Sequence, residues 1–268
     1  MLFNKIVIWL VGRIVKSPFY PHWLNDLKAS QGNNSVLNRI QGSVIEVGAG
    51  DGRKKHLLCF QYPAIKKYVA TDFSSWDNEF NKIDQKIQTS YVQSVISGFE
   101  KRNTIDVVCD ATKLPFHGSS FDYHLGFEVL EHISDPVKYM KEAVRVLKPG
   151  GRIILSVPYM YRMHGKEPEH KWDYYRYSLG FFHEACKQFN IKLEKVVCNT
   201  GMGTTVASMI NQWLIRQIAE RQFLAKWISV LVAVICFPIC NCMGYVIDLK
   251  PDIRFATRIH VVMKKKRK

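Results

Sequence analysis

Short apolar runs alternate with segments of helical spacing through the first two thirds of the chain. Five runs have the length and β-branched content of buried strands, and several end in an acidic residue or a glycine turn. Between the fourth and fifth runs, Asp135–Leu147 places apolar residues on one helical face, with Pro136 in its first turn. Strands alternating with helices predict an α/β fold around a mainly parallel sheet. Two of these strands are expected within 43–47 and 68–72.

The last third predicts two further strands, separated by a long apolar segment. Lys192–Cys198 fits a sixth strand, and Ala256–Met263 alternates as a seventh. Trp227–Ile247 holds 21 residues without a charge and is interrupted by Pro238. Hydropathy alone would assign a transmembrane helix, but a single span would separate the seventh strand from the sheet. We therefore expect a helical hairpin turning near Pro238, which either dips into one leaflet or packs on the body.

The N-terminal segment combines apolar and basic residues. Met1–Val15 reads as a basic amphipathic helix, too short to span a bilayer. It could lie among lipid headgroups or cap the substrate side of the fold, and the pattern does not separate these alternatives. Residues 22–42 read as a polar approach with a turn at Gly32–Ser35. The predicted units are residues 1–42, a core over 43–200 with a substrate loop at 158–178, an apolar helical insertion over 201–255, and a last strand with a basic tail over 256–268.

Charge and cysteine usage limit the class of protein. The 268-residue chain has a formal net charge of +15, which indicates a polyanionic partner, either an anionic membrane surface or nucleic acid. Its seven cysteines show neither a disulfide framework nor zinc-finger spacing. Together with the lack of a recognisable secretory signal, this predicts reduced thiols in the cytoplasm.

A glycine turn follows the first predicted strand. Gly48, Gly50 and Gly52 are spaced G-x-G-x-G, unlike the G-x-G-x-x-G turn that binds dinucleotides. Glu46 in the strand and Asp51 in the turn would repel a phosphate, so the turn suits a cationic ligand. Glycine at these positions also lets a ligand approach the main chain closely.

These residues resemble motif I of the class I S-adenosylmethionine-dependent methyltransferases, in particular the type 11 group. Later segments resemble the family in the same order: Tyr68–Asp72, Ile105–Ala111, Phe121–His132 and Ala143–Leu155. The resemblance implies a Rossmann-like, doubly wound mixed sheet of seven strands, the last antiparallel, with S-adenosylmethionine as cofactor. It places Asp72 on the ribose hydroxyls. The implied cofactor residues are Glu46, Gly48, Gly50, Gly52, Asp72, Phe73, Asp110, Ala111 and Phe127.

The substrate loop, residues 158–178, is rich in titratable and aromatic residues. Its His170–Tyr177 segment resembles one common in bacterial type 11 enzymes. We predict His170 or Asp173 as the general base for a hydroxyl acceptor and Arg176 as the partner of an anionic acceptor group. Alternatively, His170 and Asp173 pair with each other and only hold the loop in place.

A second candidate for chemistry is Glu128-Val-Leu-Glu131-His132. It resembles the metal-binding segment of ubiquinone-pathway and small-RNA methyltransferases, but it also occurs in relatives not thought to bind metal. Because no second histidine downstream is clearly in register, we assign no metal and expect Glu131 and His132 to line the site.

Together these features predict an O-methyltransferase acting on a membrane-proximal acceptor, either a lipid-linked glycan or a quinone precursor. Such an enzyme would be cytoplasmic and peripherally bound to an anionic membrane. An RNA methyltransferase would explain the charge but not the apolar insertion. A third alternative is a catalytically silent module that binds the cofactor without turnover.

Overall fold

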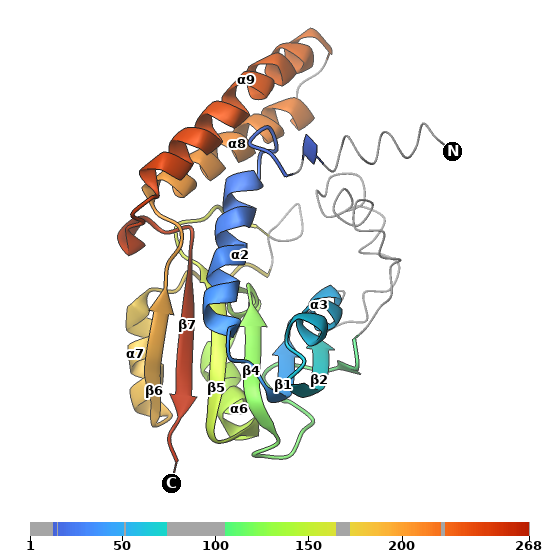
Figure 1. Ribbon diagram of the computed structural model, residues 1–268, viewed down its shortest axis with the longest axis vertical. Coiled ribbons are helices and arrows are strands. Elements are labelled where there is room, and N and C mark those ends of the chain that lie inside the picture. The colour runs from blue at the N-terminus through green and yellow to red at the C-terminus, as the bar shows by residue number, and fades with distance from the viewer. Residues whose placement is uncertain are drawn as a thin grey trace, which may run out of the picture.

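The computed structural model describes residues 13–14, 16–50, 52–73, 105–164, 172–220 and 223–267. Within them, seven strands form one sheet in the order β3-β2-β1-β4-β5-β7-β6 (Figure 1). The strands are β1 (Gly42–Val47), β2 (Ile65–Asp72), β3 (Val107–Val108), β4 (Phe121–Phe127), β5 (Leu147–Pro158), β6 (Ile191–Val197) and β7 (Arg258–Lys265). The helices are α2 (Trp23–Leu37), α3 (Arg53–Gln61), α6 (Pro136–Val146), α7 (Leu179–Gln188), α8 (Met202–Glu220) and α9 (Phe223–Ile247), with short 3-10 helices η1 (Leu130–His132) and η2 (Ile253–Phe255).

Strand directions confirm the predicted mixed sheet. β1 pairs in parallel with β2 and β4, and β4 pairs in parallel with β5. β7 lies between β5 and β6 and is antiparallel to both. The strand order reverses between β1 and β4, which is where sheets of this kind bind ligands at their carboxyl ends.

Alternate residues of the strands build two cores. On one face, Ile153 and Leu155 of β5 join a cluster that includes residues of α6 and α7. On the other, Ile154 packs in a cluster with residues of α2 and α3. Figure 1 shows these helix pairs on opposite sides of the sheet. Successive side chains of a strand point to opposite faces of the sheet, so the apolar residues of β5 contribute to both cores. Helices therefore cover both faces of the sheet.

The turn predicted at Gly32–Ser35 is wrong, because α2 runs through it without interruption. A Cβ atom on Gly32 would overlap the ring of His260 in β7. The same ring is tied to α2 by a 3.1 Å hydrogen bond between His260 Nε2 and Asn33 Oδ1. Gly32 is thus a site of close helix-to-sheet packing, which overrides its local preference for a turn.

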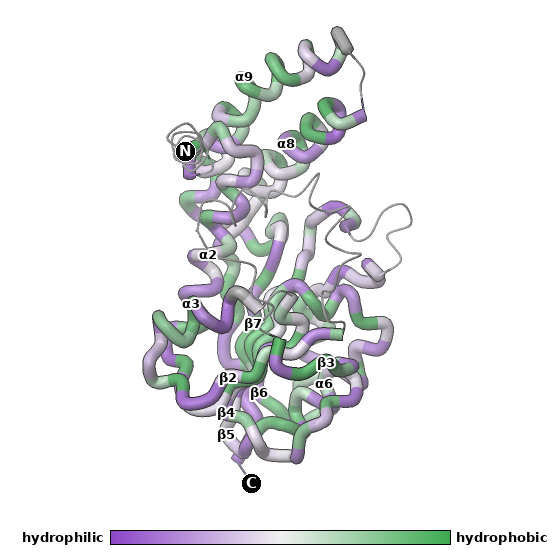
Figure 2. The backbone as a smooth tube through the Cα atoms, turned by 90° about the vertical axis from the view of Figure 1, so that its right-hand side faces the viewer, coloured by the Kyte–Doolittle hydropathy of each residue, from purple (hydrophilic) through white to green (hydrophobic). Residues whose placement is uncertain are grey.

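The apolar insertion is a hairpin, but its turn is not near Pro238. α9 continues through Pro238 as one helix of 25 residues, and it lies alongside α8 (Figures 1 and 2). We call this helix pair the α8–α9 arm. α8 ends at Glu220 and α9 begins at Phe223, so the predicted hairpin within Trp227–Ile247, turning near Pro238, is wrong, and α9 pairs with α8 instead.

Polar contacts fix the base of the α8–α9 arm. Asn241 is buried and donates to the carbonyl oxygens of Pro18 (2.7 Å) and Tyr20 (2.9 Å). Its own oxygen accepts from Asn211 at 3.0 Å. Nearer the end of α9, a Cβ on Gly244 would lie 2.6 Å from the carbonyl oxygen of Gly203 in α8. The two helices are therefore in backbone-to-backbone contact at this point.

Both ends of the α8–α9 arm are attached to the sheet. The chain leaves β6, forms the arm and returns as β7, the neighbour of β6. Among the described residues, Ala225–Ile247 is long and apolar enough to cross a membrane, and 17% of its most apolar stretch is buried. A single crossing by α9 is incompatible with the position of β7. The predicted amphipathic helix at residues 1–15 falls almost wholly outside the described part of the chain.

Candidate active site

The glycine turn lies at the carboxyl end of β1 and has the backbone that its sequence predicts. Gly48, Gly50 and Gly52 have φ angles of 70°, 62° and 73°, in the left-handed region that favours glycine. A Cβ on Gly48 would overlap Val129, whereas one on Gly50 would meet nothing within 4 Å. The absence of a side chain at Gly48 therefore makes room for Val129. The free space beside Gly50 lets a ligand approach the backbone.

Asp72 ends β2 beside this turn. Its carboxylate accepts from the backbone N–H of Gly50 and from that of Phe73, both at 2.7 Å. These bonds hold the side chain against the glycine turn. Each carboxylate oxygen keeps a further lone pair, as recognition of two ribose hydroxyls would require.

Glu46 lies fully buried in β1, below the turn. Burial raises the pKa of its carboxyl group, although Lys54 and a 2.7 Å hydrogen bond from the Tyr68 hydroxyl oppose this rise. The Lys54 ammonium lies 3.5 Å from Glu46 Oε1 and 4.7 Å from the centre of the Phe127 ring. Lys54 was not predicted as a site residue. In the sequence it is distinguished only by its place at the start of the helix that follows the glycine turn.

The other predicted cofactor residues gather at the same edge of the sheet. Phe73 follows β2 and is 78% exposed, so its ring is free to pack on a ligand. Asp110 follows β3 and accepts from the N–H (2.7 Å) and hydroxyl (2.8 Å) of Thr112. Ala111 and Phe127 are buried. The roles of these residues in binding the cofactor stay predictions.

Glu128 follows β4 in a conformation that non-glycine residues rarely adopt, with φ of 54°. Its Oε1 accepts from Ser156 at 2.8 Å, and Arg258 lies 3.8 Å from its Oε2. Burial would raise its pKa, but Arg258 and Ser156 outweigh this effect, so the pKa is lowered. Strained backbone of this kind is common at functional sites.

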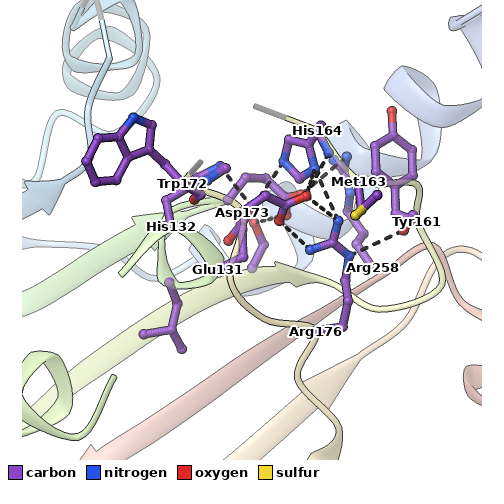
Figure 3. Close-up of polar contacts among 12 residues, drawn as sticks. Glu131, His132, Tyr161, Met163, His164, Trp172, Asp173, Arg176 and Arg258 are labelled. Carbon is purple, nitrogen blue, oxygen red and sulfur yellow. Dashed lines mark hydrogen bonds and ion pairs between the residues drawn. The ribbon is translucent and has the colours of Figure 1, made fainter. Parts of the chain in front are cut away.

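Next to Glu128, two segments distant in sequence bring Glu131, His132 and His164 together (Figure 3). Burial raises the pKa of Glu131, although His164 opposes the rise. Burial would lower the pKa of His164, but Glu131 and Asp173 outweigh it and raise the pKa. The sequence did not identify His164 as the second histidine, because its position depends on the path of the chain after β5.

In the substrate loop, Asp173 and Arg176 bind each other (Figure 3). Two parallel bonds join them: Nη1 to Oδ1 at 2.5 Å and Nη2 to Oδ2 at 2.7 Å. Arg176 also donates to the carbonyl oxygens of Tyr161, Arg162 and Tyr175. Asp173 accepts from the backbone N–H of His164 at 2.7 Å. The Arg176 pairing lowers the pKa of Asp173 despite burial, which raises it.

These contacts fit a positioning role for both residues, since the guanidinium already has protein acceptors. His170 lies outside the described residues, so its predicted pairing with Asp173 stays untested. The site thus combines an open glycine turn, an acidic edge suited to a cationic ligand, and a group of imidazoles and carboxylates close by. Such an arrangement can bind a sulfonium cofactor and accept a proton from a nearby hydroxyl.

The fold and site define a class I S-adenosylmethionine-dependent methyltransferase domain. Residues 45–155 match the family model described as "Methyltransferase domain", so this segment is a methyltransferase domain. The predictions of the family, the sheet and the cofactor S-adenosylmethionine are thereby confirmed.

Curated relatives match over short stretches. The chain is 34% identical over 77 residues to a tRNA U34 carboxymethyltransferase of Campylobacter curvus, covering 29% of this chain and 26% of that protein. It is 34% identical over 74 residues to a ubiquinone biosynthesis O-methyltransferase of Parvibaculum lavamentivorans, covering 27% and 28%. The matches thus span about a quarter of these relatives.

Solved structures resemble the chain over most of its length. The [4+2]-cyclase SpnF superposes with a TM-score of 0.53 and 16% identity, covering 90% of this chain and 82% of SpnF. A geranyl diphosphate C-methyltransferase from Streptomyces coelicolor gives a TM-score of 0.51 and 12% identity, covering 92% and 85%. Likeness at this identity concerns the fold alone, and a cyclase among the matches shows that this fold supports more than one reaction.

Proposed function

We propose that this chain transfers the methyl group of S-adenosylmethionine to an oxygen of a membrane-proximal acceptor, either a lipid-linked glycan or an isoprenoid quinone precursor. The observation that carries the proposal is the attachment of an exposed apolar arm to the substrate loop. A cytoplasmic protein, held peripherally on an anionic membrane, would then have its site beside the lipid surface.

The attachment is made by Gln212 of α8. Its Nε2 donates to the Tyr161 hydroxyl at 2.8 Å, and its Oε1 accepts from Nε of Arg162. Both partners belong to the substrate loop and lie shortly before His164 in the sequence. A membrane surface bound by the α8–α9 arm would therefore lie close to the loop that would receive the acceptor.

Many apolar side chains of the α8–α9 arm remain exposed although its two helices pack on each other. Among the described residues, a small apolar cluster around Leu214, Ala233 and Phe237 is buried where the two helices pack. Figure 2 shows apolar residues along most of α9. Exposed apolar patches of this extent mark interaction surfaces. The exposed large side chains include Met209, Ile210, Trp213, Trp227, Ile228, Leu231, Val234, Ile235, Ile239, Met243 and Val246.

Charge complements this apolar surface. Exposed Lys226 and Lys250 lie near the two ends of α9, within a chain whose formal charge is +15. Each basic residue close to an anionic membrane contributes about 1 kcal/mol, in addition to burial of apolar side chains at the headgroup boundary. Trp213 and Trp227 are of the type that concentrates at such boundaries.

Methylation of RNA is the second candidate. It is favoured by the net charge and by the short match to a tRNA-modifying relative. It leaves the apolar arm without a role. Binding to RNA that falls steeply with salt, without binding to vesicles, would support it over our proposal. A silent module would bind S-adenosylmethionine and methylate neither RNA nor lipid.

Replacing Trp227 and Leu231 together with aspartate is expected to abolish binding to anionic vesicles. The change places two charges on an apolar surface that would have to enter the headgroup boundary. Co-flotation with vesicles containing phosphatidylserine measures the binding. Mass spectrometry of lipid extracts from cells carrying the wild type should show a species heavier by one methylene, which disappears in this variant.

The matched control is Phe60→Asp, because Phe60 is 89% exposed on α3, away from the α8–α9 arm. It should bind vesicles like the wild type. Equal flotation of the arm variant and the wild type would overturn the membrane assignment. An unchanged lipid profile, with flotation intact, would instead overturn the acceptor class.

His170→Ala and Arg176→Ala are expected to lose turnover while keeping their affinity for S-adenosylmethionine. Loss of a general base lowers the rate about 10²- to 10⁴-fold. Arg176→Ala releases Asp173 and three carbonyl oxygens of the substrate loop, so we expect at least a tenfold loss. Single-turnover kinetics and calorimetry measure the two quantities. Unfolding of both variants would show that these residues only hold the loop in place.

A further inference from the structure

Three side chains of metal-ligating type converge beside η1. Glu131 and His132 belong to η1, and His164 comes from the segment after β5 (Figure 3). One ligand atom from each lies within 4.8 Å of the other two. The fold, not local sequence, brings them together.

The Glu131 carboxylate is the buried member of this cluster. It is 0% exposed, and neither of its oxygens has a hydrogen-bond partner among the described residues. The nearest imidazole atoms are Nε2 of His164, 3.5 Å from Oε1, and Nε2 of His132, 3.7 Å from the same oxygen. A buried charge without a partner costs several kcal/mol, so a cation bound here would stabilise the ionised carboxylate.

The spacing fits a shared ion better than direct pairing. Bonds of about 2.0–2.1 Å at tetrahedral angles place neighbouring ligand atoms about 3.4 Å apart. The observed separations of 3.5 and 3.7 Å are close to that value. Charge-assisted hydrogen bonds between imidazolium and carboxylate are shorter, about 2.7–2.9 Å.

Both imidazoles are held by their other nitrogen. Nδ1 of His132 lies 2.5 Å from the carbonyl oxygen of Trp172, which can only accept, so Nδ1 carries the proton and Nε2 offers a lone pair. Nδ1 of His164 lies 3.5 Å from Asp173 Oδ2 and from Arg176 Nη2. Histidine ligands of metals are oriented by contacts of this kind.

We infer that Glu131, His132 and His164 bind a divalent transition-metal ion such as Zn²⁺. Two imidazoles and one carboxylate suit such ions, and three protein ligands leave a position open for water or an acceptor oxygen. Glu128 is not needed as a ligand, because Ser156 already donates to it.

The role of the ion rests on the proposed O-methylation. Val129, which immediately precedes η1, packs against Gly48 of the glycine turn, so the ion would lie at the same end of the sheet as the cofactor. An acceptor hydroxyl bound at the open position would have its pKa lowered and would lose its proton more easily. The substrate class is then one that presents a hydroxyl able to bind a metal.

The test measures metal binding without cofactor or acceptor. The full chain, stripped with a chelator, is titrated with Co²⁺ while visible absorption is followed, and with Zn²⁺ by calorimetry. We expect one ion per chain, and at least a tenfold weaker affinity in Glu131→Gln, His132→Asn and His164→Asn. The matched control is His183→Asn, at an exposed position on α7, which should bind like the wild type.

Thermal melts establish that each variant is folded. If Glu131→Gln does not fold, the two histidine variants decide, because their side chains are 30% and 26% exposed and tolerate change better. No ion uptake by the wild type, or affinities within about threefold in the folded variants, overturns the inference. Binding of S-adenosylmethionine, measured separately, tells whether the proposed function stands when the metal site does not.

Discussion

Asp72→Ala is expected to weaken binding of S-adenosylmethionine by about 2–4 kcal/mol, which is roughly 30- to 1,000-fold in affinity. The carboxylate is already oriented by the N–H groups of Gly50 and Phe73, so it can accept from both ribose hydroxyls without further ordering. The variant loses these two charge-assisted bonds and also loosens the glycine turn. Calorimetric titration with S-adenosylmethionine and with its demethylated product measures the change.

The control for this measurement is Asp122→Ala. Asp122 lies at the start of β4, at the other end of the sheet, where it accepts from Ser43 and Lys148. Its loss should affect stability and leave cofactor affinity unchanged. Equal affinity of Asp72→Ala and the wild type would contradict the assignment of the ribose site.

Asp248→Ala is expected to lower the free energy of unfolding by about 3–5 kcal/mol. Asp248 is buried at the foot of α9 and accepts four hydrogen bonds from the start of α8. The donors are the N–H groups of Gly201, Gly203 and Thr204 and the Thr204 hydroxyl, at 2.8, 2.9, 2.8 and 2.5 Å. Alanine would leave three N–H groups without an acceptor at a positive helix end.

Urea denaturation followed by far-ultraviolet circular dichroism measures this loss. Asp252→Ala is the matched control, because Asp252 pairs with exposed Arg254 and its loss should lower the free energy of unfolding far less than the loss of Asp248. A loss below about 1 kcal/mol in Asp248→Ala would show that the foot of the α8–α9 arm is held by its apolar packing and by Asn241 instead.

The parts of the fold that sequence predicted are those set by local chemistry. The positive φ angles of Gly48, Gly50 and Gly52 are required by a turn that only glycine forms easily, so their spacing was informative. The segments of β4 and β5 were likewise recognised as strands from their resemblance to the family, and the acidic end of β2 marked Asp72.

Errors arose where distant contacts override local preference. Gly32 has a turn-forming residue type but packs on His260, which lies far away in sequence. Pro238 interrupts a helical pattern yet lies inside α9, whose packing on α8 continues on both sides of it. In the candidate site, His164 joins Glu131 only through the path of the chain after β5, which leaves no mark in residue spacing.

The position of β7 has a consequence for how the chain folds. β6 ends at Val197 and its neighbour β7 begins at Arg258, so this strand pairing must close a long loop. Closure entropy grows only slowly with loop length, by about 0.6 kcal/mol for each doubling, but pairing of distant strands slows folding. A helix pair forms from local contacts, and the hydrogen bonds that Gly201, Gly203 and Thr204 donate to Asp248 bring its two ends together. The α8–α9 arm is thus expected to form first and to shorten the effective loop between β6 and β7. Residues added or removed at the end of the arm far from the sheet would then not delay the pairing of these strands.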